Sequence, residues 1–367
     1  MNQARRRAGK PSGGVPAAAV ITGLGGCLPP RVVDNDELAG RLDTSDEWIR
    51  SRTGIASRRW VDPGVSTADL AVAAGRGALE SAGHRSADLV ILATSTPDRR
   101  IPATAPEVAW RLGLEAVPAF DLDAACAGFV YALALASAQV EAAVFERVLV
   151  IGADTYSTIL DRRDRNTAVL FGDGAGAVLL CAGRAGQSGE LFVSRLGSDG
   201  AGSGLVAVAA GGSRLPESPA DADRGLRYLR VEGKETYRNA VQRMSEVTAE
   251  LIRDMGWSAD EVQALVAHQA NQRILDTVAA RLGLSADRCV GNIRDVGNTA
   301  AASVPLALAD AAARRAVRAG ARTVLTAFGG GLAWGAVALT WPAALPVMHL
   351  PALQEAPVEG GGHYALP

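Results

Sequence analysis

Short apolar runs alternate along this chain with longer, alanine-rich stretches that have helical periodicity. The apolar runs, which predict buried strands, cover 18–23, 89–93, 119–122, 147–152, 175–181, 264–267, 323–327 and 335–341. The expected helices cover 66–82, 105–112, 127–144, 233–255, 272–282 and 304–319. Strands that are apolar on both faces and alternate with helices are typical of α/β proteins, so the pattern predicts α/β layers.

The order of these elements repeats within the chain. The sequence RLGL at 111–114 is followed by Cys126 and an alanine-rich helix, and the same sequence at 281–284 is followed by Asn298 and a similar helix. We interpret this as a duplication into an N-terminal half, 17–185, and a C-terminal half, 190–341, related by a pseudo-twofold axis. Residues 1–16 form an expected flexible basic tail, and residues 342–367 a Pro/Gly-rich tail. Cys126 and Asn298 should then converge where the halves meet.

Composition narrows the class of protein. Of 367 residues, 48% are hydrophobic and 21% charged, as in a soluble globular enzyme. The formal net charge of −2 gives no overall attraction for nucleic acid. Residues 323–350 carry no charge but contain glycines and prolines, so no membrane span is expected. Widely spaced cysteines without a CxxC pair, and no apparent signal peptide, predict a cytoplasmic protein without a metal site.

Cys126 is the candidate nucleophile. It lies in 123–129 (DAACAGF), where an expected strand turns into a helix. The helix dipole and free N–H groups at such a point favour the thiolate, and the small neighbours leave backbone N–H groups accessible to a substrate carbonyl. A buried apolar cysteine is the alternative for this segment taken alone.

His268 and Asn298 are the candidate partners of this cysteine. His268 follows an expected core strand in 267–271 (AHQAN), and Asn298 begins a second small-residue turn in 297–303 (GNTAAAS). A structural histidine and an ordinary helix cap are the alternatives. The glycine run after Phe328 allows a backbone N–H group, such as that of Gly330, to face a bound oxyanion.

Together these residues resemble β-ketoacyl-acyl-carrier-protein synthase III, a condensing enzyme of the thiolase superfamily. The resemblance covers about residues 18–341. Its motifs are DTSDEWI (43–49), RTGI (52–55), AACAGF (124–129), FGDGAG (171–176), HQAN (268–271), GNT (297–299) and FGGG (328–331). It implies a duplicated five-layered αβαβα thiolase-like fold and a homodimer.

The resemblance also implies a decarboxylative Claisen condensation that starts a fatty acid or polyketide. Cys126 would take an acyl group from acyl-CoA, which is a substrate, so no cofactor is expected. The N–H groups of Cys126 and Gly330 would form the oxyanion hole. His268 and Asn298 would stabilise the enolate formed from malonyl-acyl carrier protein, and Phe328 would assist loss of CO₂ by excluding water.

Further roles carried over from the family concern binding. The positions that would bind CoA are Trp48, Arg52, Arg165, Lys234, Tyr237 and Asn271. Two of them depart from the usual bacterial pattern: Lys234 replaces an asparagine and Tyr237 a phenylalanine. Ile101 would cap the acyl pocket across the dimer. The candidates for contacting the acidic carrier protein are Arg238, Arg273 and Arg281, although each could equally lie on a solvated helix face.

Two other functions remain open at this point. An acyltransferase of the same fold would pass the acyl group from Cys126 to a hydroxyl or amine of a specialised metabolite, and the altered Lys234 and Tyr237 favour it. A non-catalytic partner subunit is disfavoured by the intact Cys126. The presence of His268 and Asn298 favours condensation, because simple acyl transfer has less need of enolate stabilisation.

Overall fold

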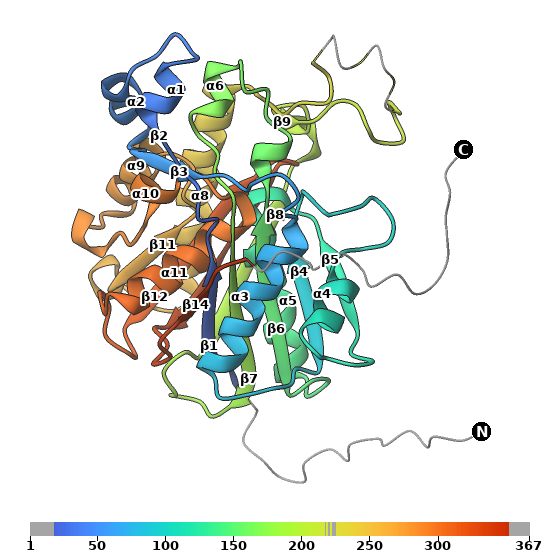
Figure 1. Cartoon of the computed structure of the whole chain (residues 1–367). Helices are drawn as coiled ribbons and strands as arrows, with labels where there is room; N and C mark the ends of the chain where they lie inside the picture. The colour runs from blue at the N-terminus through green and yellow to red at the C-terminus, as the bar shows by residue number, and fades with distance from the viewer. Residues whose placement is uncertain (1–17, 217, 219–220, 222–224, 352–367) are drawn as a thin grey trace, which may run out of the picture.

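The computed structural model describes residues 18–216, 218, 221 and 225–351 (Figure 1). Two sheets dominate it. The six-stranded sheet has the order β14 (Val347–His349), β1 (Ala18–Cys27), β7 (Gly174–Gly183), β6 (Arg147–Asp154), β4 (Leu89–Ala93), β5 (Ala119–Leu122). The four-stranded sheet has the order β11 (Ala264–Ala267), β12 (Arg322–Gly329), β13 (Ala333–Thr340), β8 (Leu191–Ser198). Small pairs are formed by β2 (Val32–Asp34) with β3 (Ser57–Arg59) and by β9 (Val206–Ala207) with β10 (Arg230–Val231).

Helices complete five layers. The outer layer on the first sheet contains α3 (Thr67–Ser81) and α4 (Ala105–Arg111). Between the sheets lie α5 (Gly128–Glu141) and α11 (Ser303–Ala313), and the outer layer on the second sheet contains α8 (Gly233–Asp254) and α9 (Gln272–Leu282). The shorter helices are α1 (Asn35–Ala39), α2 (Asp46–Thr53), α6 (Arg165–Ala168) and α10 (Ile293–Val296). The predicted αβαβα architecture is therefore confirmed.

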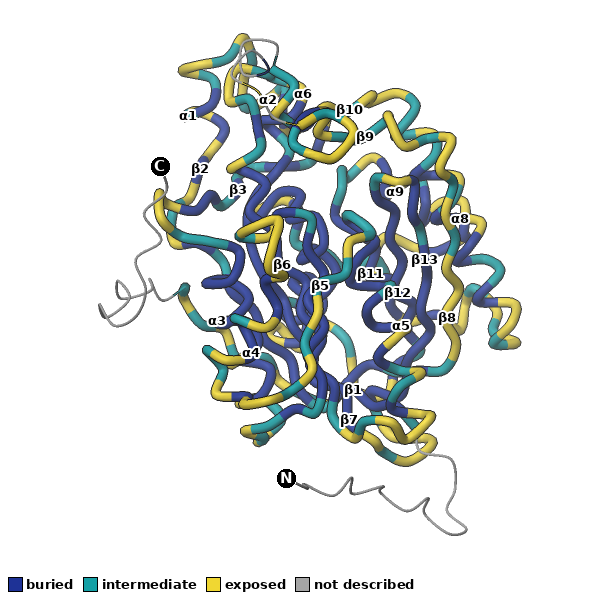
Figure 2. Tube along the Cα trace, turned by 90° about the vertical axis from the view of Figure 1, so that its right-hand side faces the viewer, coloured by how far each residue is buried: buried dark blue, intermediate teal, exposed yellow. Residues whose placement is uncertain are grey.

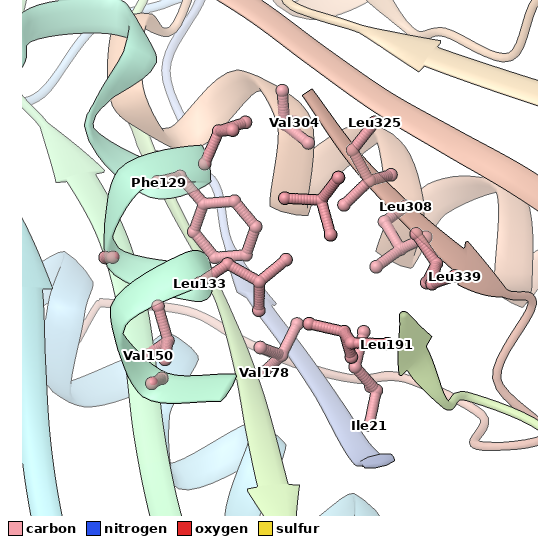
Figure 3. Close-up of a cluster of buried hydrophobic side chains, with 14 of the residues drawn as sticks. Ile21, Phe129, Leu133, Val150, Val178, Leu191, Val304, Leu308, Leu325 and Leu339 are labelled. Atoms are coloured by element: carbon pink, nitrogen blue, oxygen red, sulfur yellow. The ribbon is translucent and has the colours of Figure 1, made fainter. Parts of the chain in front are cut away.

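The central layer is the main core of the molecule. Side chains from α5 and α11 meet those of both sheets, and the central strands, such as β6, β12 and β13, are coloured as buried in the tube view (Figure 2). Figure 3 labels the contributors Ile21, Phe129, Leu133, Val150, Val178, Leu191, Val304, Leu308, Leu325 and Leu339. This core packs around α5 and α11, the helices that follow the turns with Cys126 and Asn298. Close packing of the two helices therefore fixes the positions of those turns.

The two sheets have corresponding strand orders. In the first, β1 and β6 flank β7, with β4 next to β6; in the second, β8 and β12 flank β13, with β11 next to β12. The pairings β1 with β7 and β8 with β13 are both antiparallel, and those of β4 with β6 and β11 with β12 are both parallel. The change of sheet falls between β7 and β8, at residues 184–190.

Several expectations about the elements need correction. The C-terminal tail expected from 342 contributes β14, which pairs in parallel with β1 and places His349 Nε2 at 2.8 Å from Glu80 Oε2. The helix expected over 304–319 ends at Ala313, and Arg315 takes a φ of 52° just beyond it. The N-terminal tail lies outside the described residues. Among those described, no helix is long and apolar enough to cross a membrane.

Candidate active site

Two short turns of nearly identical geometry meet at the centre of the molecule. The 3₁₀ turn η1 (Ala125–Ala127) contains Cys126 and leads into α5, while η6 (Ala300–Ala302) follows Asn298 and leads into α11. Ala125 has a φ of 46° and Ala300 a φ of 48°. The turns pack against each other. Side chains from opposite halves of the chain therefore converge here.

The correspondence between the turns differs from the predicted one. Asp123 Oδ1 accepts a hydrogen bond from the Ala125 N–H at 2.9 Å, and Asn298 Oδ1 accepts one from the Ala300 N–H at the same distance. Asn298 thus corresponds to Asp123, and Cys126 corresponds to Ala301. The sequence comparison paired Cys126 with Asn298, which is three residues from this correspondence, because the loops between RLGL and the turns differ in length.

Each turn is approached by a strand of the other half. A Cβ added to Gly329, at the end of β12, would lie 2.7 Å from the Cys126 amide nitrogen. A Cβ added to Gly152, in β6, would lie 2.4 Å from the Ala301 carbonyl oxygen. Real Cβ atoms do not come this close, so both positions require glycine. The reciprocal approach locks the two halves together around the turns.

Cys126 is buried, with 8% of its surface exposed, at the start of α5. Burial raises the pKa of its thiol to about 12, and the negative charge of Asp154 adds to this rise. Hydrogen bonds from its own backbone and from the Tyr156 side chain act in the opposite direction. The thiol therefore depends on nearby donors and on the helix N-terminus to reach its nucleophilic form.

His268 is held by a serine of the neighbouring turn. Its Nδ1 lies 2.6 Å from Ser303 Oγ, which also accepts a hydrogen bond from the Gln269 N–H at 3.3 Å. With that N–H already donating to it, Ser303 is best placed to donate its hydroxyl proton to Nδ1. Burial lowers the pKa of His268 to about 3, so the ring is neutral. The proton then resides on Nε2, which makes Nε2 a hydrogen-bond donor.

Asn298 is oriented in a similar way. The Asn298 N–H donates a hydrogen bond to the Leu170 carbonyl, and the Asn298 carbonyl accepts one from the Gly172 N–H, each at 2.9 Å. Because Oδ1 is occupied by the Ala300 N–H, the side-chain Nδ2 remains as a donor. His268 and Asn298 thus supply two neutral donors, the combination that stabilises a developing enolate.

Asp154, at the end of β6, forms hydrogen bonds with both halves of the chain. Its carboxylate accepts hydrogen bonds from the Ser95 N–H and the Ala301 N–H, both at 2.9 Å, and from the hydroxyls of Thr94 and Thr96. Burial raises its pKa to about 7, although these hydrogen bonds oppose the rise. Asp154 therefore fixes η6 to the carboxyl end of β6.

An open cavity of about 630 Å³ lies beside the η1 turn, at Asp123, Ala124 and Ala125. Its lining includes Ala125, Tyr156, Val206, Leu229, Gly330 and Leu332. Gly330 thus lines the same cavity as Ala125, the neighbour of Cys126, and Phe328, which is 4% exposed, lies near the end of β12, two residues before Gly330. The cavity has both apolar walls and hydroxyl groups, as ligand pockets usually do.

The candidate CoA residues lie on one end of the molecule, where α2 and α6 are seen in Figure 1. The Arg165 guanidinium stacks over the Trp48 ring at 5.0 Å, and Asn271 Nδ2 donates to the Arg52 carbonyl at 3.2 Å. Cation and ring are thus paired in a cation–π contact on this surface.

The two departures from the family pattern are on α8. Lys234 is exposed in the first turn of the helix. The Tyr237 hydroxyl bonds to Thr277 Oγ1 at 2.9 Å, and the Arg273 guanidinium lies 5.8 Å from the Tyr237 ring centroid. The added hydroxyl of Tyr237 is therefore already satisfied within the protein.

The carrier-protein candidates are distributed over two packed helices. Arg238 is exposed on α8 and forms an ion pair with Glu235 at 3.0 Å, while Arg273 and Arg281 are exposed on α9. Ile101 is 87% exposed in the loop between β4 and α4, and it does not line the Cys126 cavity of its own chain. A role in capping that cavity would require a second copy.

Three residues of the site were not singled out from the sequence: Asp154, Tyr156 and Ser303. Asp154 ends a buried strand, and a carboxylate there is a usable signal. Tyr156 lies two residues later, and Ser303 ends the second small-residue turn and begins α11. Their contacts are with residues distant along the chain, which a single sequence does not reveal.

Comparison with known proteins gives consistent results. Residues 120–200 match the family description "3-Oxoacyl-[acyl-carrier-protein (ACP)] synthase III", and residues 252–341 match its C-terminal counterpart. Beta-ketoacyl-[acyl-carrier-protein] synthase III 2 of Streptomyces coelicolor is 54% identical over 90% of this chain and 96% of its own length. The crystal structure of the synthase III of Pseudomonas aeruginosa superposes with a TM-score of 0.84 and 47% identity, covering 90% of this chain and all of that one. A priming β-ketosynthase of a polyketide pathway superposes with a TM-score of 0.82 and 34% identity, covering 90% of this chain and 99% of its own.

Proposed function

Because the chain belongs to the 3-oxoacyl-acyl-carrier-protein synthase III family, we propose that it catalyses the decarboxylative condensation of an acyl-CoA with malonyl-acyl carrier protein. The product is a β-ketoacyl-carrier protein that starts a fatty acid or polyketide. The observation that supports this proposal is the packing of η1, which contains Cys126, against η6, which follows Asn298 and leads into Ser303, the hydrogen-bond partner of His268.

In the first half-reaction, the Cys126 thiolate attacks the thioester carbonyl of acyl-CoA. The N–H groups of Cys126 and Gly330 stabilise the tetrahedral oxyanion, and the close approach of β12 at Gly329 supports this arrangement. Coenzyme A leaves as a thiolate and takes up a proton from solvent. The acyl group stays on Cys126 as a thioester.

In the second half-reaction, malonyl-carrier protein occupies the same site. The bond between its C2 and carboxylate breaks, CO₂ leaves, and the electron pair forms an enolate whose oxygen accepts hydrogen bonds from His268 Nε2 and Asn298 Nδ2. Phe328 keeps water away from the departing carboxylate. C2 then attacks the acyl carbonyl, and Cys126 leaves as a thiolate, which restores the enzyme.

Substrate binding uses the surfaces on either side of the site. Trp48 and Arg52 hold the adenine end of CoA with Arg165 and Asn271, and Lys234 and Tyr237 flank the pantetheine arm. The stacking of Arg165 on Trp48 supports this assignment. Arg238, Arg273 and Arg281 attract the acidic carrier protein, because three exposed cations on adjoining helices steer an anionic partner.

A homodimer completes the site. β5 is the edge strand of the six-stranded sheet, and exposed apolar side chains surround it: Phe120 is 41% exposed, Trp110 69% and Ile101 87%. Such an edge invites pairing with another strand. A second copy would cover it and deliver Ile101 to the mouth of the acyl cavity. The cytoplasmic location expected from the cysteines remains a prediction.

The proposal is tested by intact-protein mass after incubation with short, branched and aromatic acyl-CoAs, followed by malonyl-carrier protein. We expect one acyl mass on the wild type, none on Cys126→Ala, and discharge of the acyl group with formation of β-ketoacyl-carrier protein. An adduct that malonyl-carrier protein fails to discharge would point instead to an acyltransferase with a hydroxyl or amine acceptor. Absence of any adduct would contradict the role of Cys126.

A further inference from the structure

The two strands that end beside the η1 and η6 turns correspond residue by residue. β6 and β12 each have eight residues. Each pairs in parallel with its neighbour, β4 or β11, starting at its second residue, which is Val148 in β6 and Thr323 in β12. The last residues, Asp154 and Gly329, therefore also correspond. One half ends its strand on a carboxylate where the other half ends on a glycine.

Asp154 and Gly329 lie next to equivalent N–H groups. Cys126 corresponds to Ala301, and the Ala301 N–H donates a hydrogen bond to Asp154 Oδ2 at 2.9 Å. A Cβ added to Gly329 would lie 2.7 Å from the Cys126 nitrogen, and glycine has no side chain that could accept from this N–H. The N–H group assigned to the substrate oxyanion in the first half is thus bound by a carboxylate of the protein in the second half.

The Asp154 carboxylate is itself held by the first half of the chain. Its Oδ1 accepts hydrogen bonds from the Ser95 N–H at 2.9 Å and from the hydroxyls of Thr94 at 3.1 Å and Thr96 at 2.9 Å, and the residue is fully buried. A buried carboxylate with these donors is confined to one position, and its charge strengthens the hydrogen bond from the Ala301 N–H. Among the described residues, its hydrogen bonds reach η6 and the segment after β4, but not η1.

Ala301 lies between the two contacts that orient the candidate enolate donors. One residue earlier, the Ala300 N–H donates to Asn298 Oδ1 at 2.9 Å. Two residues later, Ser303 Oγ lies 2.6 Å from His268 Nδ1. A shift of Ala301 would therefore disturb both contacts at once.

We propose that Asp154 is a positioning residue for the second half-reaction, in which its carboxylate fixes η6 and thereby holds Asn298 and His268 in place as enolate donors. This inference rests on the proposed function, because enolate stabilisation belongs to the condensation. Burial and, after it, the negative charge of Asp154 raise the pKa of the Cys126 thiol. Loss of the charge should therefore impair the second turn without impairing the nucleophile of the first.

The test compares Asp154→Asn with the wild type, because the amide keeps the shape of the side chain but removes its charge and one acceptor oxygen. In hydrogen–deuterium exchange, the N–H groups of η6 should exchange about tenfold faster, while those of η1 keep their rates. Discharge of acyl-Cys126 by malonyl-carrier protein should slow about 30-fold, with a change in KM for malonyl-carrier protein below about twofold. Alkylation of Cys126 by iodoacetamide should be no slower than in the wild type.

A second variant and a control accompany this test. Thr94→Val removes one hydroxyl donor to Asp154 and should change exchange and discharge in the same direction by about threefold, which decides the proposal should Asp154→Asn fail to fold. The matched control is Asp69→Asn on the outer helix α3. Asp69 is 4% exposed and accepts hydrogen bonds from the Ser66 N–H at 2.8 Å and from Arg111 at 2.7 Å. This control should melt at a lower temperature but keep the exchange rates of both turns and the ratio of discharge to alkylation.

Exchange and discharge rates that coincide with the wild type in Asp154→Asn would overturn the proposal. Equal losses of alkylation and discharge would overturn it as well, because they indicate general destabilisation. Exchange and alkylation require neither acyl-CoA nor a carrier protein. A wild type that malonyl-carrier protein fails to discharge would therefore contradict the proposed function, while exchange at η6 would still decide the role of Asp154.

Discussion

The η1 and η6 turns share a backbone but not a chemistry. Both contain an alanine with φ near 47°, both are closed by a side-chain oxygen two residues before that alanine, and both open an alanine-rich helix of the central layer. η1 presents Cys126 where η6 has Ala301, and η6 is preceded by Asn298 where η1 has Asp123. The fold supplies two equivalent positions, and single side chains give one turn the nucleophile and the other the enolate donor.

The surroundings reinforce this difference. Asp123 is exposed, whereas Asn298 is only 5% exposed. α11 begins with Ser303, which bonds to His268, while α5 begins with Gly128. A serine hydroxyl is useful only where a histidine needs orienting. The two turns therefore share a backbone conformation and differ in the side chains at a few equivalent positions.

The largest effect is expected from making the first turn resemble the second. Cys126→Ala should abolish the acyl adduct and lower condensation at least about a thousandfold, because the covalent route is lost. The buried Cys181, which contacts Thr22 Oγ1 at 3.2 Å, supplies the matched control, and Cys181→Ala should keep the adduct. Intact mass and a melting curve measure both; an adduct on Cys126→Ala would contradict the assignment.

The second pair of variants exchanges the equivalent residues Asn298 and Asp123 of the two turns. Asn298→Asp keeps the acceptor for the Ala300 N–H but replaces the Nδ2 donor by a carboxyl oxygen, so condensation should fall about 100-fold to 1,000-fold while acyl loading persists. Asp123→Asn should retain condensation within about threefold, because its Oδ1 still accepts from the Ala125 N–H. Single-turnover rates of both half-reactions check this. Equal losses in the two variants would mean that the turns are not specialised.

A smaller effect is expected at the start of the second helix. Ser303→Ala removes the donor to His268 Nδ1, so the proton is no longer confined to Nε2, and condensation should fall about tenfold. The ¹⁵N chemical shifts of His268 report the tautomer directly. A wild type protonated on Nδ1, or an unchanged tautomer in the variant, would refute the role of Ser303.

Another effect concerns the pH dependence of stability and leaves activity at neutral pH unchanged. Burial lowers the pKa of His268 from 6.5 to about 3, so below pH 6.5 the unfolded chain binds a proton that the native protein excludes. The free energy of unfolding is therefore unaffected by His268 above pH 6.5, and it decreases as the pH falls below 6.5 towards 3. From pH 6 to pH 4 the free energy of unfolding should therefore fall more steeply than in His268→Gln, by up to about 1.4 kcal/mol per pH unit. Urea unfolding at several pH values measures the difference, and parallel curves would show that His268 is accessible to protons.

Much of the fold could be predicted from the sequence because its central strands are apolar on both faces. β4, β5, β11 and α9 have the expected bounds. β8 was missed because its outer positions are exposed and its apolar residues do not alternate regularly. β14 was missed because its pairing with β1 depends on residues more than 300 positions away.

Only some residues of the candidate site could be predicted from the sequence. Cys126, His268 and Asn298 lie at strand-to-helix junctions that the pattern of small residues reveals. The pairing of Cys126 with Asn298 was wrong by three residues, because the loops that precede the two turns differ in length. Tyr156 and Ser303 were missed because a hydroxyl acquires its role from a partner brought close only by folding.

Acyl transfer at the first turn should be coupled to decarboxylation at the second. This coupling is measured by the number of CO₂ molecules released per acyl group discharged in a single turnover of preformed acyl-enzyme with malonyl-carrier protein. We expect one CO₂ for each acyl group lost from Cys126, together with one β-ketoacyl-carrier protein. Discharge of the acyl group without release of CO₂ would contradict this coupling.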